Sequence, residues 1–293
     1  MATSSGSDSK EYENGTSATF DHAAGLNSSQ TAAQRERARF DYGGNPLAHT
    51  NTGDSARFPA FGGEFQPGLY KPTTGRKFGN PAPLGLSAFA LTTFVLSLIN
   101  IGVKNVHEPN IVVALAFGYG GLVQLLAGMW EMAVGNTFGA TALSSYGGFW
   151  LSFAILLTPG GFQIEAAYTG ATAGSNDFTN AFGFFLAGWF VFTSILLLCT
   201  LRSTVAFFLL FFFLDLTFLL LSIGYLYGQD GAPKAVVIKA GGYFGIFAAF
   251  MSWYNALAGI ADDSNSFFVI PVAHFPWSVK GRERRAVTKS EDV

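Results

Sequence analysis

The sequence predicts an all-α membrane protein in which six transmembrane helices form a bundle. Of the 293 residues, 49% are hydrophobic and 12% are charged, whereas soluble domains carry about 25% charged residues. Phe occurs 31 times and Gly 35 times, which is typical of helices that face lipid with Phe and one another with Gly. A helix needs about 20 apolar residues to cross a bilayer core. Six runs meet this requirement: residues 84–101, 111–132, 137–157, 181–201, 205–227 and 236–261.

The six runs differ in how apolar they are. The second and third contain many Gly, Ser and Thr residues, so we expect them to be buried inside the bundle. The fifth contains an unbroken series of Phe and Leu at residues 207–213. We therefore expect the fifth helix to face lipid.

The chain divides into three parts. Residues 1–78 are rich in Ser, Thr, Gly and charge and have no sustained apolar period, so they are predicted to form a disordered cytoplasmic tail. Residues 79–262 are predicted to form the six-helix transmembrane domain. Residues 263–293 are predicted to be a cytoplasmic C-terminal segment.

The positive charges near the ends of the spans predict the orientation. Lys and Arg mark the cytoplasmic side of a membrane protein, and most of them lie on the side of the two termini. This side carries Lys71, Arg76, Lys77, Arg202, Lys280, Arg282, Arg284 and Arg285, and the other side carries Lys104, Lys234 and Lys239. We therefore expect a multi-pass plasma-membrane protein with both termini in the cytoplasm.

Several classes of function are disfavoured by composition. The formal net charge is −2 and no basic patch is present, so a nucleic-acid partner is not expected. The single cysteine, Cys199, lies inside an apolar run and has no second cysteine to pair with. The four His residues are scattered, and no catalytic or metal-binding motif occurs. We expect no enzyme activity, no catalytic residues, no metal site and no cofactor.

Polar side chains within the spans indicate a shared hydrophilic path, because such groups are costly in hydrocarbon. Helical spacing places the aromatic side chain of Phe89 and three polar side chains on one face of the first span. Similar polar side chains occur in the second and third spans. Any one of these side chains could equally form hydrogen bonds within or between helices. The candidates are Phe89, Thr93, Ser97, Asn100, Gln124, Glu131, Asn136, Thr137, Thr141 and Ser145.

Asp215 lies near the middle of the fifth span. A carboxyl group at that depth is either neutral or paired with a cation, and Lys239 is the candidate partner. Asp215 is therefore either a structural carboxyl group of the bundle or a proton-linked switch.

Asn80 opens the string Asn-Pro-Ala-Pro-Leu-Gly-Leu at residues 80–86, where the first span begins. Its side chain can cap the helix ahead of Pro81 and Pro83. The free backbone N–H groups of a helix N-terminus also favour an anion. The two roles are compatible, and both remain open.

Residues 79–276 resemble the acetate uptake transporter family. The resemblance rests on the string at residues 80–86, on Tyr-Gly-Gly at 119–121, on Gly-Asn-Thr-Phe-Gly at 135–139 and on Ser-Tyr-Gly-Gly-Phe-Trp at 145–150. Because these motifs occur in the family's order, chance similarity is improbable. The tail and the long loop at residues 158–180, which the charge pattern places outside the cell, resemble those of the fungal members.

The resemblance implies transport of acetate or another small monocarboxylate across the lipid bilayer, by proton-coupled symport or through an anion channel. It also implies six-helix protomers that assemble as hexamers, each protomer enclosing its own pore. The family's narrowest point is a ring of Phe, Tyr and Leu, which maps to Phe89, Tyr146 and Leu214. Two alternatives are an ammonium or ammonia exporter and a membrane sensor that transports nothing and signals through its tail.

Overall fold

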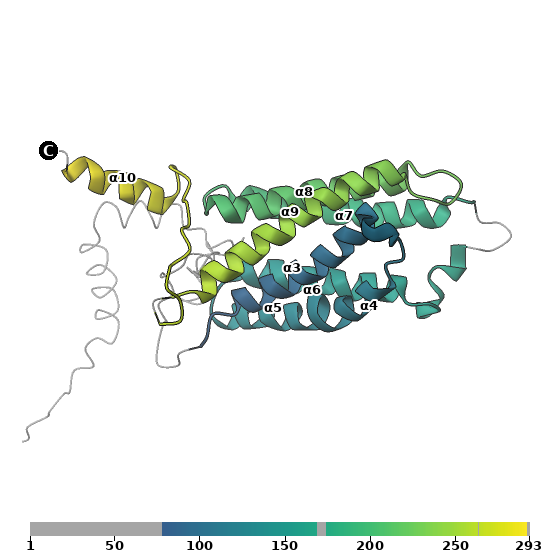
Figure 1. The fold of residues 1–293 in the computed structure, drawn as a ribbon, viewed down its shortest axis with the longest axis horizontal. Coiled ribbons are helices and arrows are strands. Elements are labelled where there is room, and N and C mark those ends of the chain that lie inside the picture. The colour runs from purple at the N-terminus through teal and green to yellow at the C-terminus, as the bar shows by residue number, and fades with distance from the viewer. Residues whose placement is uncertain (1–77, 169–173, 263, 292–293) are drawn as a thin grey trace, which may run out of the picture. The chain divides into compact units, whose positions relative to one another are not determined.

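The computed structural model describes residues 78–168, 174–262 and 264–291, so the predicted tail lies outside the described residues except for its last position. The described part is helical, and six of its helices are long and apolar enough to cross a membrane, which confirms the predicted number of spans (Figure 1). The elements are α3 (Ala82–Ile101), η2 (Val103–Asn105), α4 (Asn110–Phe117), η3 (Gly118–Val123), α5 (Gln124–Ala133), α6 (Thr137–Leu157), η4 (Gly161–Gln163), η5 (Ala166–Tyr168), α7 (Asp177–Thr200), α8 (Val205–Leu226), α9 (Ala235–Ile260) and α10 (Val279–Glu291).

The helix ends follow from local sequence. Pro83 lies in the first turn of α3, and Gly102, with φ 78°, ends that helix in the left-handed conformation, which only Gly adopts without steric cost. The side chain of Asn136 accepts a hydrogen bond from the backbone N–H of Gly139 at the start of α6. Thr204 accepts one from the N–H of Phe207 at the start of α8. Pro, Gly, Asn and Thr thus set where these spans begin and end.

The second span is interrupted, a feature that we did not predict from the sequence. Between α4 and α5 the chain forms a π-helix, η3. A Cβ atom at Gly121 would lie 2.2 Å from the carbonyl oxygen of Ala116, so this turn needs Gly at that position. Turns of this type occur frequently at functional sites, and Gln124 is the first residue after it.

The spans pack through small residues. α9 packs against α3 and α8, α7 packs against α8, and α5 packs against α6 and α3. A Cβ atom at Gly245 of α9 would lie 2.2 Å from the Oγ of Ser97 on α3, and one at Gly128 of α5 would lie 2.3 Å from the Oγ of Ser144 on α6. Small residues at these contacts therefore bring neighbouring backbones close together.

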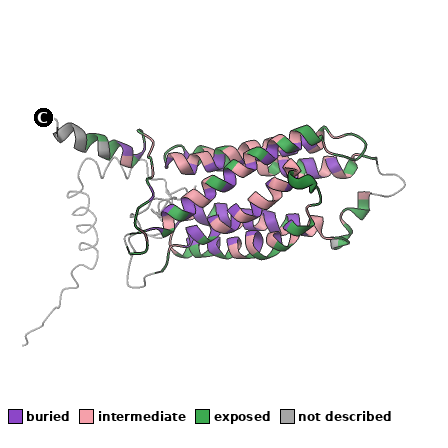
Figure 2. Cartoon of the chain, viewed as in Figure 1, coloured by how far each residue is buried: buried purple, intermediate pink, exposed green. Residues whose placement is uncertain are grey.

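The prediction that the fifth span faces lipid is only partly right. In its most apolar 18-residue stretch, 44% of the residues of α8 are buried, against 28% for α7, and the burial pattern of both helices can be followed in Figure 2. α8 lies between α7 and α9 and supplies Phe207, Phe211 and Leu214 to the core. The fourth span, not the fifth, is therefore the most exposed.

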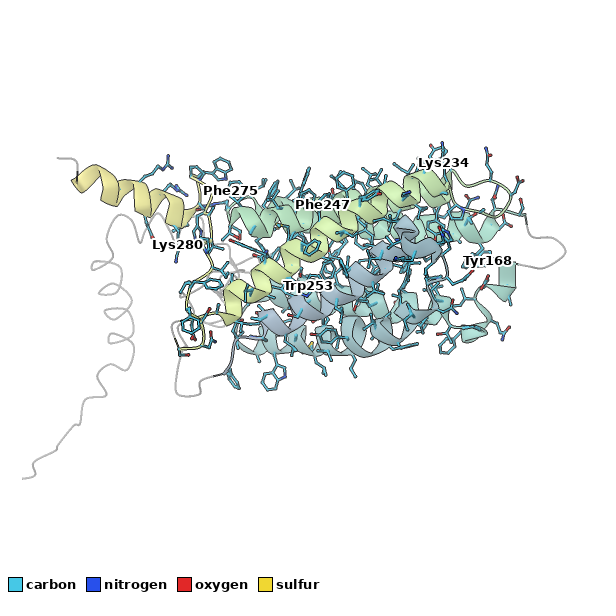
Figure 3. All side chains as sticks on the ribbon, viewed as in Figure 1. Tyr168, Lys234, Phe247, Trp253, Phe275 and Lys280 are labelled. Carbon is cyan, nitrogen blue, oxygen red and sulfur yellow. The ribbon has the colours of Figure 1, made fainter. Side chains whose placement is uncertain are left out.

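The C-terminal segment returns to the connection between α7 and α8. The N–H of Val205 donates a hydrogen bond to the carbonyl oxygen of Ala273, at 2.8 Å, and the indole N–H of Trp277 donates one to Leu201, at 2.7 Å. The chain then forms α10, a helix that was not predicted. Figure 3 shows Lys280 at this end of the bundle and Lys234 at the opposite end.

Candidate functional site

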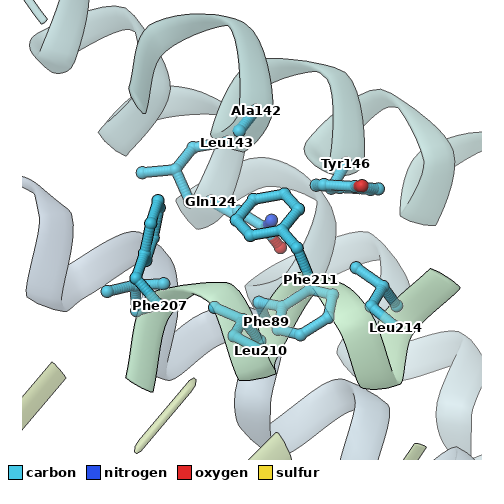
Figure 4. A pocket seen from close by; sticks show the side chains of 10 residues that line it. Phe89, Gln124, Ala142, Leu143, Tyr146, Phe207, Leu210, Phe211 and Leu214 are labelled. Atoms are coloured by element: carbon cyan, nitrogen blue, oxygen red, sulfur yellow. The ribbon is translucent and has the colours of Figure 1, made fainter. Parts of the chain in front are cut away.

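A cavity lies between α3, α5, α6 and α8 (Figure 4). Gln124 and Tyr146 are its two lining residues with polar side-chain groups, and the surface that the lining presents to the cavity is apolar. The Tyr146 hydroxyl lies 2.9 Å from the Oγ1 of Thr193 on α7, a residue that does not line the cavity. The lining residues are Leu86, Phe89, Gln124, Ala142, Leu143, Tyr146, Phe207, Leu210, Phe211 and Leu214.

The three residues of the predicted ring lie on this one cavity. The ring centroids of Phe89 and Tyr146 are 5.9 Å apart, and Leu214 joins them from α8. All three side chains are buried. They come from the first, third and fifth spans, which run in the same direction, so one apolar layer is built from three parallel helices.

Gln124 is the polar group that the cavity leaves without a partner. Its side chain is 0% exposed, and neither its Oε1 nor its Nε2 has a hydrogen-bond partner among the described residues. A buried polar group that lacks a partner typically costs about 1–3 kcal/mol, so each such group in a native protein calls for an explanation, such as strain, a functional role, or a bound water or ion. Figure 4 shows Gln124 among the side chains that line the cavity, together with Phe89, Phe211 and Tyr146.

Glu131 and Asn136 form a buried polar pair at the turn between α5 and α6. The Nδ2 of Asn136 donates a hydrogen bond to the Oε2 of Glu131 at 2.7 Å, and the backbone N–H of Asn136 donates one to the carbonyl oxygen of Glu131 at 2.9 Å. Gly135 occupies this turn with φ 87°. These bonds hold the turn, and neither side chain lines the cavity.

Comparison with known proteins gives the family. Residues 61–277 match the sequence profile described as the GPR1/FUN34/yaaH family. The chain belongs to this family. It is 69% identical over 263 residues to "Acetate permease A" of Emericella nidulans, an alignment that covers 89% of this chain and 87% of that protein. It is 53% identical over 213 residues to "Ammonia transport outward protein 2" of Saccharomyces cerevisiae, covering 73% and 72%.

A solved structure has the same fold. The "bacterial acetate channel SatP" aligns with a TM-score of 0.56 and 35% sequence identity, over 67% of this chain and 100% of the channel. Membership of the GPR1/FUN34/yaaH family and the six membrane-length helices establish a multi-pass membrane protein. The first-span string, the ring residues and Gln124 all lie within the matched region.

The polar residues of α3 lie outside the cavity in this member of the GPR1/FUN34/yaaH family. Thr93 is buried, and its Oγ1 has no hydrogen-bond partner within the described ranges. Ser97 packs closely against Gly245 of α9. Asn100 is half-buried near Gly242 of the same helix. None of the three therefore lines the cavity, and Ser97 and Asn100 face α9 instead.

The polar residues of α6 are dispersed. Thr141 is exposed, and its hydroxyl donates a hydrogen bond to the carbonyl oxygen of Thr137 on the same helix, at 2.8 Å. Thr137 and Ser145 are half-buried, and none of the three lines the cavity. The structure thus brings Gln124 to the predicted ring and leaves the hydroxyl groups of α6 apart from it.

Asn80 and Asp215 have local partners. The Oδ1 of Asn80 accepts a hydrogen bond from the N–H of Ala82, the first residue of α3, at 3.1 Å, and the N-cap position itself is Pro81. Lys239, the candidate partner of Asp215, is exposed, and the Oδ1 of Asp215 instead accepts a hydrogen bond from the Oγ of Ser194 at 2.8 Å. Asp215 follows Leu214 but points toward α7 because successive helix residues face about 100° apart.

Of the α8 residues that line the cavity, the sequence analysis predicted only Leu214. Phe207, Leu210 and Phe211 line the cavity together with Leu214, at the spacing of three, four and seven residues that marks one helix face. This spacing could have identified the wall, given Leu214. The surrounding run is apolar on all sides, so it offers no contrast that marks which face is inward.

Proposed function

We propose that the chain transports acetate and related short monocarboxylates through the cavity between α3, α5, α6 and α8. The observation that carries the proposal is the buried amide of Gln124, which has no partner among the described residues and lies beside an apolar layer. The naming of the relatives as an acetate permease and an acetate channel supports this substrate class.

The chemistry of the cavity suits a short carboxylic acid. Moving a bare carboxylate through hydrocarbon is prohibitive unless hydrogen-bond donors replace its water. The NH₂ group of Gln124 can donate to a carboxylate, and its carbonyl oxygen can accept from the protonated acid. The methyl group would rest against Phe89, Tyr146 and Leu214. One polar contact beside an apolar layer fits acetate better than a large or multiply charged solute.

The Gln124→Met variant is expected to reduce acetate flux into proteoliposomes by about tenfold to a hundredfold. Met has a similar length but no donor, and a hydrogen bond to a charged group contributes about 1.5–3 kcal/mol. Labelled acetate uptake is the measurement. Gln163→Met, in the exposed connection after α6, is the control and is expected to behave as the unchanged protein. Equal flux in both variants would contradict the role of Gln124.

Asp215 is the candidate for proton coupling, and its position allows a direct test. It does not line the cavity, and Ser194 is its hydrogen-bond partner. An inward proton gradient is expected to drive acetate uptake against its own gradient if transport is coupled, and Asp215→Asn would abolish that accumulation while leaving downhill flux. Accumulation that survives in Asp215→Asn would remove this residue from the coupling mechanism. Downhill flux alone in the unchanged protein would indicate a passive channel.

Ammonia or ammonium export is the second candidate. It is favoured by the similarity to "Ammonia transport outward protein 2" and by the aromatic faces around the cavity, which can attract a cation. Parallel measurements of acetate and methylammonium flux in the same proteoliposomes separate the two candidates. A protein that carries neither solute would instead support the third hypothesis, a membrane sensor.

We also propose that both termini face the cytoplasm at the plasma membrane and that the protomers assemble, as hexamers by resemblance to the family. The orientation is supported by Arg202 and Lys280 at the end where α3 begins and α9 finishes, against Lys104 and Lys234 at the other. Accessibility of introduced cysteines to a membrane-impermeant reagent tests the orientation, and cross-linking in native membranes tests the assembly.

A further inference from the structure

The hydroxyl group of Tyr146 forms its hydrogen bond on the side of the ring that faces away from the cavity, toward α7. It lies 2.9 Å from the Oγ1 of Thr193, and that Oγ1 also lies 2.7 Å from the carbonyl oxygen of Trp189, one turn earlier on α7. A threonine hydroxyl has one hydrogen to donate. Because the carbonyl oxygen can only accept, Thr193 donates to Trp189 and Tyr146 donates to Thr193. The cavity therefore meets the ring of Tyr146 and not its hydroxyl group.

The same stretch of α7 holds the ring of Tyr146 by packing. Trp189 and Phe192 lie 5.9 Å and 5.8 Å from it, measured between ring centroids. Phe218 of α8 stacks on it at 6.4 Å with an interplanar angle of 9°. α7 supplies no residue to the cavity lining, so its contribution to the cavity is made from behind Tyr146.

The next residue of α7 supports a second member of the ring layer. The Oγ of Ser194 lies 2.8 Å from the Oδ1 of Asp215 and 3.0 Å from the carbonyl oxygen of Phe190. Asp215 directly follows Leu214, which lines the cavity. The hydroxyl group of Thr193 thus connects α7 to Tyr146 on α6. The hydroxyl group of the next residue, Ser194, connects α7 to α8 at Asp215, beside Leu214.

We propose that Thr193 is a positioning residue that fixes the ring of Tyr146 and thereby sets the longest acid that passes the cavity. The proposal rests on the proposed function, since it assigns Thr193 to the selectivity of the same cavity. Without the Thr193 hydroxyl, the buried Tyr146 hydroxyl loses the side chain that accepts its hydrogen bond. The other polar side chain among the lining residues is Gln124, and a movement of the Tyr146 hydroxyl toward it would shift the aromatic ring out of the layer that it shares with Phe89.

The test is the flux of acids of increasing chain length through proteoliposomes that contain the full chain. Thr193→Val keeps the shape of the side chain and removes the acceptor. The ratio of butyrate to acetate flux is expected to rise about threefold or more, because a buried hydroxyl without a partner favours another position of the ring. Thr193→Ser restores the acceptor and is expected to keep the ratio of the unchanged protein.

A double-mutant cycle separates positioning from packing. Tyr146→Phe removes the other end of the hydrogen bond and leaves α7 unchanged, so adding Thr193→Val to it is expected to change the ratio no further. Thr200→Val is the control because Thr200 is also fully buried on α7, and within the described residues its hydroxyl group bonds only to its own helix, through the carbonyl oxygen of Leu197.

Two results would overturn the proposal. An unchanged ratio in Thr193→Val, with acetate flux intact and butyrate excluded, would leave Thr193 as a packing residue while the proposed function stands. Additive changes in the cycle would mean that the two side chains act independently. If the unchanged protein carries no acetate at all, the proposed function itself fails. Acetate flux through the unchanged protein, which is measured first, distinguishes this outcome from a failure of the Thr193 proposal.

Discussion

Phe89→Ala is expected to raise the ratio of butyrate to acetate flux in proteoliposomes by about tenfold or more. The ring of Phe89 lines the cavity beside the ring of Tyr146, and Ala leaves most of that space empty. Adding or removing one methylene group in an apolar pocket changes the free energy of binding by about 1–3 kcal/mol, which corresponds to about 10-fold to 200-fold. Acetate flux itself is expected to persist because Gln124 is retained.

The control for this variant is Phe94→Ala on the same helix. The Phe94 ring contacts Phe250 at 5.8 Å and Trp253 at 5.3 Å, measured between centroids, and it does not line the cavity. A buried Phe→Ala change costs about 3–5 kcal/mol in soluble proteins, so thermal stability in detergent should be measured for both variants. The milder Phe89→Leu provides a second test if Phe89→Ala does not fold. Equal flux ratios in all of these proteins would contradict the role of the ring as a size filter.

The span positions could be predicted because they depend on local properties. Bilayer thickness fixes the length of each apolar run, and Pro83, Gly102, Asn136 and Thr204 mark helix ends by their own chemistry. The predicted end of the first span at residue 101 and both ends of the third, at residues 137 and 157, agree with the structure. The string at residues 80–86 could also be placed correctly, since an Asn followed by prolines has few alternatives at the start of a helix.

The inward direction of a side chain could not be predicted in the same way. Thr141 was grouped with the path because it is polar, but its hydroxyl bonds to the backbone of its own helix and it is exposed. In a helix, Ser and Thr hydroxyl groups can donate a hydrogen bond to a backbone carbonyl oxygen of the preceding turn. The presence of these residues therefore does not show that a helix face lines a hydrophilic path. Thr193 was missed for a related reason: in an apolar run, only its contact with Tyr146 across helices reveals its importance.

Gly147→Ala is expected to lower the free energy of unfolding by about 1–3 kcal/mol, the usual cost of overpacking. A Cβ atom at Gly147 would lie 2.7 Å from both the backbone nitrogen and the Cβ of Leu125 on α5, so the two helices would have to move apart. Gly148 is the matched control because a Cβ there meets nothing within 4 Å. Gly148→Ala is expected to stabilise the same helix by up to about 1 kcal/mol, since Ala is the better helix former.

The contact at Gly147 also fixes the geometry of the cavity. Gly147 follows Tyr146 and Leu125 follows Gln124, so the two backbones that meet there carry the ring and the amide of the candidate site. Separating them by a few tenths of an ångström or more changes the distance between Tyr146 and Gln124. Gly147→Ala is therefore expected to reduce both the melting temperature and acetate uptake, whereas Gly148→Ala leaves uptake intact. Thermal unfolding and proteoliposome uptake, measured on the same preparations, check this, and a Gly147→Ala protein with undiminished stability and uptake would show that α5 and α6 tolerate separation at this level.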